Sequence, residues 1–361
     1  MRWFETLVFA LPSVMLICTY LFTTWKNREL SSSPYKSSTA KPNQYRAKHS
    51  FSFNLEHCPL CRRSIHKISN RYSPSIYQKP KILSRIVAPQ SSSTCSGDSW
   101  QRGRGQRVIA FVFYGNPELI RYNTTYFEGI RANVAAISSL YQSNWSIRLY
   151  HDLGPENPWL TELCKIACKY NRLDLCRVNQ LPHPLLSNAT DMFPMLWRFF
   201  PTLDPQVDVF MSRDLDSALT QRELEAVDEW LESGKTLHVM RDHPLHSNPM
   251  LGGLWGARLR RSRTTWKSIW TSILADPLSR SSRTSNGPDQ TLLKRYVWKK
   301  LAGGVIQHDS YFCKKWPKGS LGFPSQRLNG TDNFVGAYRS YKPIWLECPK
   351  ACRRQQNWTF C

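Results

Sequence analysis

Short apolar runs separated by longer amphipathic stretches dominate the pattern of this chain after its first hundred residues. Four of these runs have the length and the Val, Ile and Phe content of buried strands, and they cover residues 107–114, 146–152, 207–211 and 236–240. The first run ends at a loop signal, Gly115-Asn116. We therefore predict strands at all four positions.

Helical periodicity fills the intervals between these runs. Residues 124–142 precede the second predicted strand and residues 191–200 precede the third. A further helix is predicted to begin at a capping box of Thr220 and Glu223 and to end at Gly234. Its expected buried stripe is Leu224, Val227, Trp230 and Leu231. Strand and helix alternation predicts an α/β fold with a mostly parallel sheet and helices on both faces.

Composition and charge divide the 361 residues into parts. A share of 41% hydrophobic and 12% aromatic residues excludes a fully disordered chain. The formal net charge is +23, and a large part of the excess lies in residues 26–106, a Ser, Lys and Pro rich stretch. We predict a largely disordered stem there, followed by one α/β domain over residues 107–361. Because the basic residues are not interleaved with aromatics on one element, nucleic acid is not an expected partner.

An uncharged segment near the start of the chain covers residues 6–25, about the 20 residues that cross a bilayer. No small-residue cleavage site follows before Lys26 and Arg28. We therefore predict that residues 1–25 form a short cytosolic tip and a signal-anchor helix, in preference to a cleaved signal peptide. Arg2 lies on the opposite side of the segment, so the flanking charges do not decide its orientation.

Glycosylation sequons and cysteines indicate the side of the membrane. Five Asn-x-Ser/Thr sequons follow the anchor, at Asn123, Asn144, Asn188, Asn329 and Asn357. Ten cysteines follow Cys18, namely Cys58, Cys61, Cys95, Cys164, Cys168, Cys176, Cys313, Cys348, Cys352 and Cys361. Disulfides in an oxidising lumen explain this even number, and buried free thiols in the cytosol are the alternative. We predict a single-pass membrane protein of the Golgi apparatus or endoplasmic reticulum with a luminal domain.

The spacing of individual cysteines adds two expectations. Cys58-x-x-Cys61 with His66 is half of a zinc pattern, but no second pair stands at finger or ribbon spacing, so we prefer a disulfide within or near the stem. Cys164 and Cys168 share one face of a predicted helix and cannot easily bridge each other. Each is expected to bond a different partner.

The strongest chemical motif follows the third predicted strand. Asp214 and Asp216 form the sole Asp-x-Asp of the chain, directly after Arg213. In an extended segment, residues two apart point the same way, so both carboxylates can face one cation, or one can hold the metal while the other hydrogen-bonds a sugar hydroxyl. Oxygen ligands beside an Arg suit Mg²⁺ or Mn²⁺ bridging a diphosphate. The alternative is that the two acids merely end a strand and favour the next helix.

These residues resemble the GT-A glycosyltransferases, α/β enzymes whose Asp-x-Asp binds a divalent metal and a nucleotide-sugar diphosphate. The resemblance rests on VDVFMSRDLDS after a helix bearing Trp197-Arg198, on the opening FVFYGN, and on the later VDEWLESGK, HVMRDHPLH and LGGLWG. It covers roughly residues 107–325. The set is similar to a poorly characterised GT-A-like group, so it implies a fold and a reaction class but no substrate.

The resemblance also assigns donor-binding residues. Tyr114 and Gly115 would lie in the loop that cradles the nucleotide base, while Arg198 and Arg213 would neutralise the diphosphate. Tyr114 as a core residue and Arg198 as half of a surface ion pair are the alternatives.

The resemblance further implies that the region after the fourth strand meets the donor sugar and the acceptor. Asp242 is a candidate general base, required if the reaction inverts configuration. The contacts to sugar or acceptor are assigned to His243, Gly252, Gly253 and Trp255. Trp255 as plain core is the alternative. A zinc pair of His243 and His246 is disfavoured because no helical Glu lies between them.

Two residues further along complete the candidate site. Asp289, in GPDQ at the start of a predicted helix, would be an acceptor-site acid or second candidate base, and a helix cap is its alternative role. His308 lies where many GT-A enzymes supply a last metal ligand, although a lone His is more often structural.

A basic run lies between Arg258 and Lys300, with 11 Lys and Arg against Asp276 and Asp289. A solvated face, an anionic acceptor groove and contact with anionic lipid all remain open for it. The sequence as a whole predicts a glycosyltransferase that uses Mn²⁺ or Mg²⁺ and a nucleotide sugar, with a glycan, glycoprotein or glycolipid acceptor. A catalytically inactive luminal module of the same fold, for glycan binding or scaffolding, is the alternative.

Overall fold

The computed structural model describes residue 58 and residues 92–115, 122–141, 144–285, 287–316, 319–327, 334–337 and 346–361. The predicted membrane anchor and most of the predicted stem lie outside these residues. Within them, no helix combines the length and the apolar character needed to span a bilayer.

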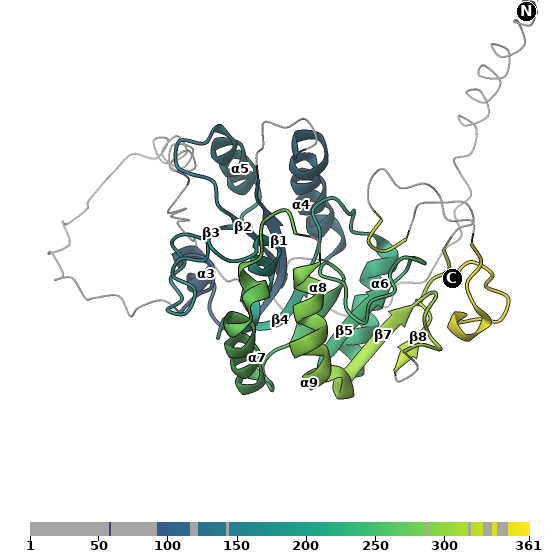
Figure 1. Cartoon of the computed structure of the whole chain (residues 1–361). Helices are drawn as coiled ribbons and strands as arrows, with labels where there is room; N and C mark the ends of the chain where they lie inside the picture. Colours follow the sequence, from purple (N-terminus) through teal and green to yellow (C-terminus); the bar gives the residue numbers. More distant parts are fainter. Residues whose placement is uncertain are drawn as a thin grey trace, which may run out of the picture. The chain divides into compact units, whose positions relative to one another are not determined.

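A mixed sheet forms the centre of the domain (Figure 1). Its strands are β1 Gln106–Phe113, β2 Trp145–His151, β3 Leu173–Arg177, β4 Val207–Ser212, β5 Leu237–Arg241, β6 Trp255–Arg258, β7 Val305–Asp309 and β8 Ser320–Leu321. The strand order is β3-β2-β1-β4-β6-β5-β7-β8. All pairs are parallel except the two that β6 makes with β4 and β5. The predicted mostly parallel sheet is confirmed, and the four predicted strands are β1, β2, β4 and β5.

Helices cover both faces of this sheet. The α-helices are α3 Gly97–Gln101, α4 Glu128–Leu140, α5 Pro158–Lys169, α6 Gln221–Ser233, α7 Arg263–Ala275, α8 Pro288–Leu292 and α9 Lys299–Leu301. The other helical segments are η1 Tyr122–Phe127 and η5 Leu293–Trp298, of π type, and η3 Pro194–Leu203, η4 Pro277–Arg280, η6 Ala302–Gly304 and η7 Lys350–Cys352, of 3₁₀ type. One apolar layer joins the sheet to α4, α5 and α6, and the other joins it to η3, α7, α8 and η5.

Helix α6 begins and ends where the sequence predicts. The hydroxyl of Thr220 accepts a hydrogen bond from the backbone N–H of Glu223 at 3.2 Å, and Gly234 ends the helix with φ at +70°. The carboxylate of Glu223 does not complete the capping box, because it accepts hydrogen bonds from Arg213 and Tyr141. The predicted stripe packs inward, with Val227 and Trp230 buried and Leu224 and Leu231 partly buried.

The segment before β1 belongs to the folded domain. Arg148 and Asp204 form a fully buried ion pair at 2.7 Å, and the backbone N–H of Thr94 donates to the same Asp204 carboxylate at 3.0 Å. Cys95 is bonded to Cys176. Ordered structure therefore begins before residue 107, where the boundary between stem and domain was expected.

Four disulfides link described residues. They are Cys58–Cys164, Cys95–Cys176, Cys313–Cys352 and Cys348–Cys361. This agrees with the disulfide interpretation of the cysteine pattern. Cys164 pairs with Cys58 and not with its helical neighbour Cys168, as its position on one helix face predicts. Cys58 is accordingly not a zinc ligand.

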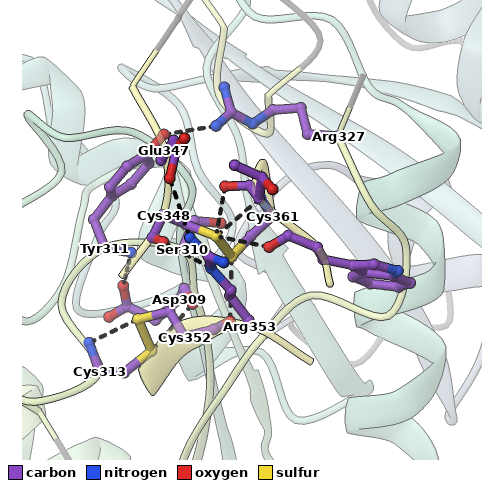
Figure 2. Close-up of a disulfide and its surroundings, with 12 residues drawn as sticks. Asp309, Ser310, Tyr311, Cys313, Arg327, Glu347, Cys348, Cys352, Arg353 and Cys361 are labelled. Carbon is purple, nitrogen blue, oxygen red and sulfur yellow. Dashed lines mark hydrogen bonds and ion pairs between the residues drawn. A yellow bond between two sulfur atoms is a disulfide. The ribbon is translucent and has the colours of Figure 1, made fainter. Parts of the chain in front are cut away.

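Two of the disulfides lie close together beyond β7 (Figure 2). The Sγ atom of Cys361 lies 3.3 Å from the carbonyl oxygen of Cys352, which connects the two bonds. In the part of the chain that the structure describes, Asp309, Cys313 and Cys352 have ligand atoms close enough to hold a metal ion. Because the two sulfurs are bonded to each other, they offer no thiolate and this group is not a metal site.

Candidate functional site

An open pocket lies where β1 and β4 end. Its volume is about 450 Å³, including the part open to solvent. It is lined by Val112, Phe113, Tyr114, Tyr126, Met195, Arg198, Asp214, Leu215 and Asp216. The structure thus brings together four residues that the sequence analysis singled out, namely Tyr114, Arg198, Asp214 and Asp216. This is the carboxyl edge of the parallel strands, where ligands bind in open α/β sheets.

Arg198 connects the Asp-x-Asp segment to helix α8. Its side chain is 2% exposed, while the side chain of Asp214 is 33% exposed. Nη1 of Arg198 bonds Oδ1 of Asp214, and Nη2 bonds Oδ2 of Asp289 at 3.1 Å. The guanidinium, which was expected to meet the donor, is therefore shared between two carboxylates at the edge of the pocket.

Two glycines of the loop between β5 and β6 pack directly on the charged group formed by the side chains of Arg198, Asp214 and Asp289. An added Cβ at Gly252 would lie 2.1 Å from Oδ2 of Asp289 and 2.4 Å from Nη2 of Arg198. An added Cβ at Gly253 would lie 1.9 Å from Oδ2 of Asp214. Ser212, the last residue of β4, donates to the carbonyl of Gly252 at 2.6 Å and holds the loop in place. Any side chain at either position would displace the charged group.

Gly253→Ala is expected to weaken ligand binding at this pocket by roughly tenfold or more, because its methyl group would push the Asp214 carboxylate away from its position. The affinity for Mn²⁺ with nucleotide, measured by calorimetry, is the test. Gly303→Ala is the matched control, since a Cβ there meets no atom within 4 Å. Equal affinities for the two variants would show that the close approach of Gly253 has no role in binding.

Carboxylates gather at this edge of the sheet. Asp214 and Asp216 line the pocket, and Asp289 bonds the same Arg198 guanidinium as Asp214. Burial raises the pKa of Asp289; Arg198 lowers it and Asp214 raises it, so the result lies above the ordinary value. Carboxylate oxygens are the ligands that Mg²⁺ and Mn²⁺ prefer. The residues present therefore fit a divalent cation at Asp214 and Asp216.

The loop after β1 supplies the aromatic side of the pocket. Tyr114 is partly exposed and packs edge to face on the buried Trp197, with ring centroids 6.1 Å apart. Tyr114 thus combines the two roles that the sequence left open, since it packs on the core and lines the pocket. Gly115 follows with φ at +104°, which explains a glycine at this turn.

Five lining residues were not predicted as site residues, and two of them, Met195 and Tyr126, come from outside β1 and the Asp-x-Asp segment. Met195 lies three residues before Arg198 in the 3₁₀ helix η3, and side chains at this spacing are aligned on one face. That spacing is the signal that would have identified Met195. Tyr126 comes from the last turn before α4, and nothing in its local sequence distinguishes it from a core aromatic.

Arg213 lies outside the pocket, contrary to expectation. Its side chain is 3% exposed and forms an ion pair with Glu223. Nη1 donates to the carbonyls of Ser212 and Trp255 at 2.7 and 3.0 Å. With its donors used inside the domain, Arg213 connects β4, β6 and α6 and is not placed to neutralise a diphosphate.

Trp255 is a core residue, so the stacking role is corrected. It is fully buried and packs on Phe210 and Phe199, with ring centroids 4.9 and 5.2 Å away. Trp266 stacks on it at 5.8 Å. No face of the indole is left for a sugar.

Asp242 is fully buried in an ion pair, which removes it as a general base. Both its oxygens accept from Arg222 at 2.8 Å, and Ser310 and the backbone N–H of Val335 donate to it as well. Burial raises the pKa of this carboxyl, but the charge and hydrogen bonds of Arg222 outweigh burial and hold it below the ordinary value. A base needs a free lone pair within reach of substrate, and Asp242 has none.

Both ring nitrogens of His308 are also hydrogen-bonded to other side chains. Its Nδ1 atom shares a hydrogen bond with Nε2 of His238 at 2.8 Å, and its Nε2 atom shares one with Glu229 at 3.1 Å. Burial lowers the pKa of His308 below its ordinary value, although Glu229 raises it in part. Both ring nitrogens are used, which corrects the assignment of His308 as a metal ligand.

His243 lies at the start of the loop between β5 and β6. It is buried against Phe334 with ring centroids 4.7 Å apart, and its Nδ1 atom accepts from the backbone N–H of Leu245. Nine members of the basic run are exposed, and they are spread over the segment from the end of β6 to α9: Arg260, Arg261, Lys267, Arg280, Arg283, Lys294, Arg295, Lys299 and Lys300.

The chain thus folds into an α/β domain with an acidic, partly aromatic pocket at the carboxyl edge of its sheet. No family model and no curated protein sequence matches the chain.

Several solved structures are similar to this chain. One is a glycosyltransferase involved in the glycosylation of the major capsid of PBCV-1, with 14% identity over 59% of this chain and 88% of that one, at a TM-score of 0.31. Another is the glycosyltransferase GlyE of Streptococcus pneumoniae, with 15% identity over 54% and 44% of the two chains, at 0.34. S. aureus TarS (residues 1–349) matches with 9% identity over 53% and 55%, at 0.32. This chain spans about half of the latter two.

Proposed function

We propose that this protein is a metal-dependent glycosyltransferase, which moves a sugar from a nucleotide-sugar donor to a hydroxyl group of a glycan, protein or lipid. The observation that supports this function best is that Asp214 and Asp216 share one open pocket with Tyr114 at the ends of β1 and β4. Such a pocket suits a nucleotide diphosphate, since an aromatic ring packs on the base and acidic residues hold the cation that the diphosphate requires.

Asp214 and Asp216 are the residues that would hold Mn²⁺ or Mg²⁺. The bound cation would neutralise the diphosphate that leaves when the sugar is transferred. Arg198 fixes the Asp214 carboxylate by an ion pair, so that this ligand is oriented before any cation binds. Gly252 and Gly253 allow the loop between β5 and β6 to approach this group closely.

Asp289 remains the candidate base if the reaction inverts configuration. It is joined to the pocket through Arg198, and its raised pKa favours proton uptake over that of an ordinary carboxylate. Its side chain is 6% exposed, so a movement of the loop that carries Gly252 is needed before it can meet an acceptor. The luminal, membrane-anchored location expected from the sequence stays a prediction.

The test is the melting temperature of the full-length protein with a panel of UDP and GDP sugars, each with and without Mn²⁺. A ligand at 100 times its dissociation constant should stabilise the fold by about 2.7 kcal/mol. We expect a shift that requires both the metal and one nucleotide sugar. Mn²⁺ alone and free nucleotide alone are the controls. A well-folded sample that responds to none of the donors would favour the non-catalytic glycan-binding or scaffolding module instead.

A further inference from the structure

The loop between β5 and β6, residues 242–254, is held at several points along the edge of the pocket. Its end carries the two glycines that touch the charged group of Arg198. In its middle, Asn248 donates to the side chain of Gln290 at 2.7 Å, next to Asp289. Nζ of Lys315 donates to the carbonyl of Ser247 at 3.0 Å. His246 therefore lies beside two anchored residues and is not on a freely moving segment.

The ring of His246 is fixed by its own hydrogen bond. Its Nδ1 atom accepts from the backbone N–H of Asp242 at 3.2 Å, and its backbone N–H donates to the carbonyl of His243 at 2.9 Å. The ring packs against His243 and Phe334 with centroids 5.4 and 6.2 Å away. With Nδ1 as acceptor, the proton of the neutral ring is on Nε2. Among the residues that the structure describes, no group bonds this Nε2 atom, and it is not fully buried.

The charge of the ring is set by its surroundings. Burial and His243 lower the pKa of His246, while Asp242 and Asp214 raise it in part, and the result is about 4. The imidazole ring is therefore neutral near pH 7.

We propose that His246 is a substrate-binding residue, whose Nε2–H donates a hydrogen bond to a hydroxyl oxygen of the acceptor. This rests on the proposed function. A neutral hydrogen-bond donor in a fixed orientation suits an uncharged hydroxyl group, whereas a phosphate binds more strongly to a positively charged donor. His246 does not line the pocket of Tyr114 and Asp216. It lies on the loop that runs between that pocket and Lys315, so an acceptor sugar is the substrate that it would meet.

The test compares His246→Leu, which removes the donor, with His246→Gln, whose amide N–H reaches to a similar distance. Transfer from the donor identified by thermal shift is measured with a panel of octyl glucoside, galactoside and mannoside, and hydrolysis of the same donor by water is measured in parallel. For His246→Leu we expect the acceptor KM to rise roughly three- to tenfold, as loss of one hydrogen bond implies. The donor KM and the rate of donor hydrolysis should stay unchanged, and His246→Gln should recover most of the loss.

Leu245→Ala is the control for loop integrity, because Leu245 is 69% exposed and adjacent in sequence. Equal acceptor KM values for wild type and His246→Leu would overturn the proposal, and so would an increase in donor KM. A wild type that hydrolyses its donor but uses none of the glycosides also counts against it. A wild type that binds no donor at all would instead overturn the proposed function, and the assignment of His246 with it.

Discussion

Asp216→Asn is expected to lower metal-dependent donor turnover by roughly a hundredfold or more, with little change in the stability of the fold. Asp216 lines the pocket beside Asp214, and the amide that replaces it has the same shape but supplies one fewer negative charge to a cation. The stabilisation by nucleotide sugar should lose its dependence on Mn²⁺. Turnover and melting temperature, each followed along a Mn²⁺ titration, are the measurements.

Asp191→Asn is the matched control, since Asp191 is exposed and is not among the residues that line the pocket. We expect it to behave as wild type. If Asp216→Asn kept its Mn²⁺ dependence and its turnover, the cation would bind elsewhere and the central assignment would be wrong.

The second large effect is expected on stability. Arg222→Met should lower the free energy of unfolding by roughly 3–5 kcal/mol, because it leaves the buried carboxylate of Asp242 without its cation. Arg222 also donates to the carbonyl oxygens of Ser325 and Cys361, and its guanidinium lies 4.2 Å from the ring centroid of Phe323. One side chain thus joins α6 to β5 and to two segments beyond β7. Urea unfolding of the purified protein is the measurement.

The double variant Arg222→Met with Asp242→Leu separates the energetic contribution of the charges from that of side-chain packing. With both charges removed, we expect a large part of the stability to return, since the cost of the single change is mainly that of an unpaired buried charge. Arg261→Met, at an exposed position, should change the free energy of unfolding by less than about 0.5 kcal/mol. If Arg222→Met were as mild as Arg261→Met, Asp242 would not depend on this ion pair.

Local patterns were sufficient to predict the elements that carry the site. The apolar runs at 107–114 and 207–211 became β1 and β4 within a residue of the predicted bounds, because strands buried on both faces are apolar throughout. Strands β3, β6, β7 and β8 were not predicted. Of these, β6 has four residues, two of them Gly256 and Ala257, and this composition has no strand periodicity. It forms by pairing between β4 and β5, which no local pattern encodes.

The sequence predicted a pocket residue correctly only where the place of that residue in the fold follows directly from its place in the chain. Asp214 and Asp216 follow a parallel strand directly, so their place at its carboxyl edge was implied by the fold. Arg213, Asp242 and His308 are equally polar and equally close to strand ends, yet each is bonded inside the domain. Their partners lie 10 to 79 residues away in the chain. Whether a polar residue faces a ligand or a partner of this kind depends on contacts that sequence spacing does not contain.

The segment that precedes β1 decides where a recombinant form of this protein can begin. A version cut at residue 107 would lack Thr94, which donates to the buried carboxylate of Asp204, and would leave Cys176 as an unpaired thiol in the core. In an oxidising secretory pathway such a thiol is a site for wrong pairing between molecules. Expression boundaries chosen at or before residue 58 keep Thr94 and Cys95 with the domain and also retain Cys58, the disulfide partner of Cys164. The purity of any shorter product would have to be judged on a non-reducing gel.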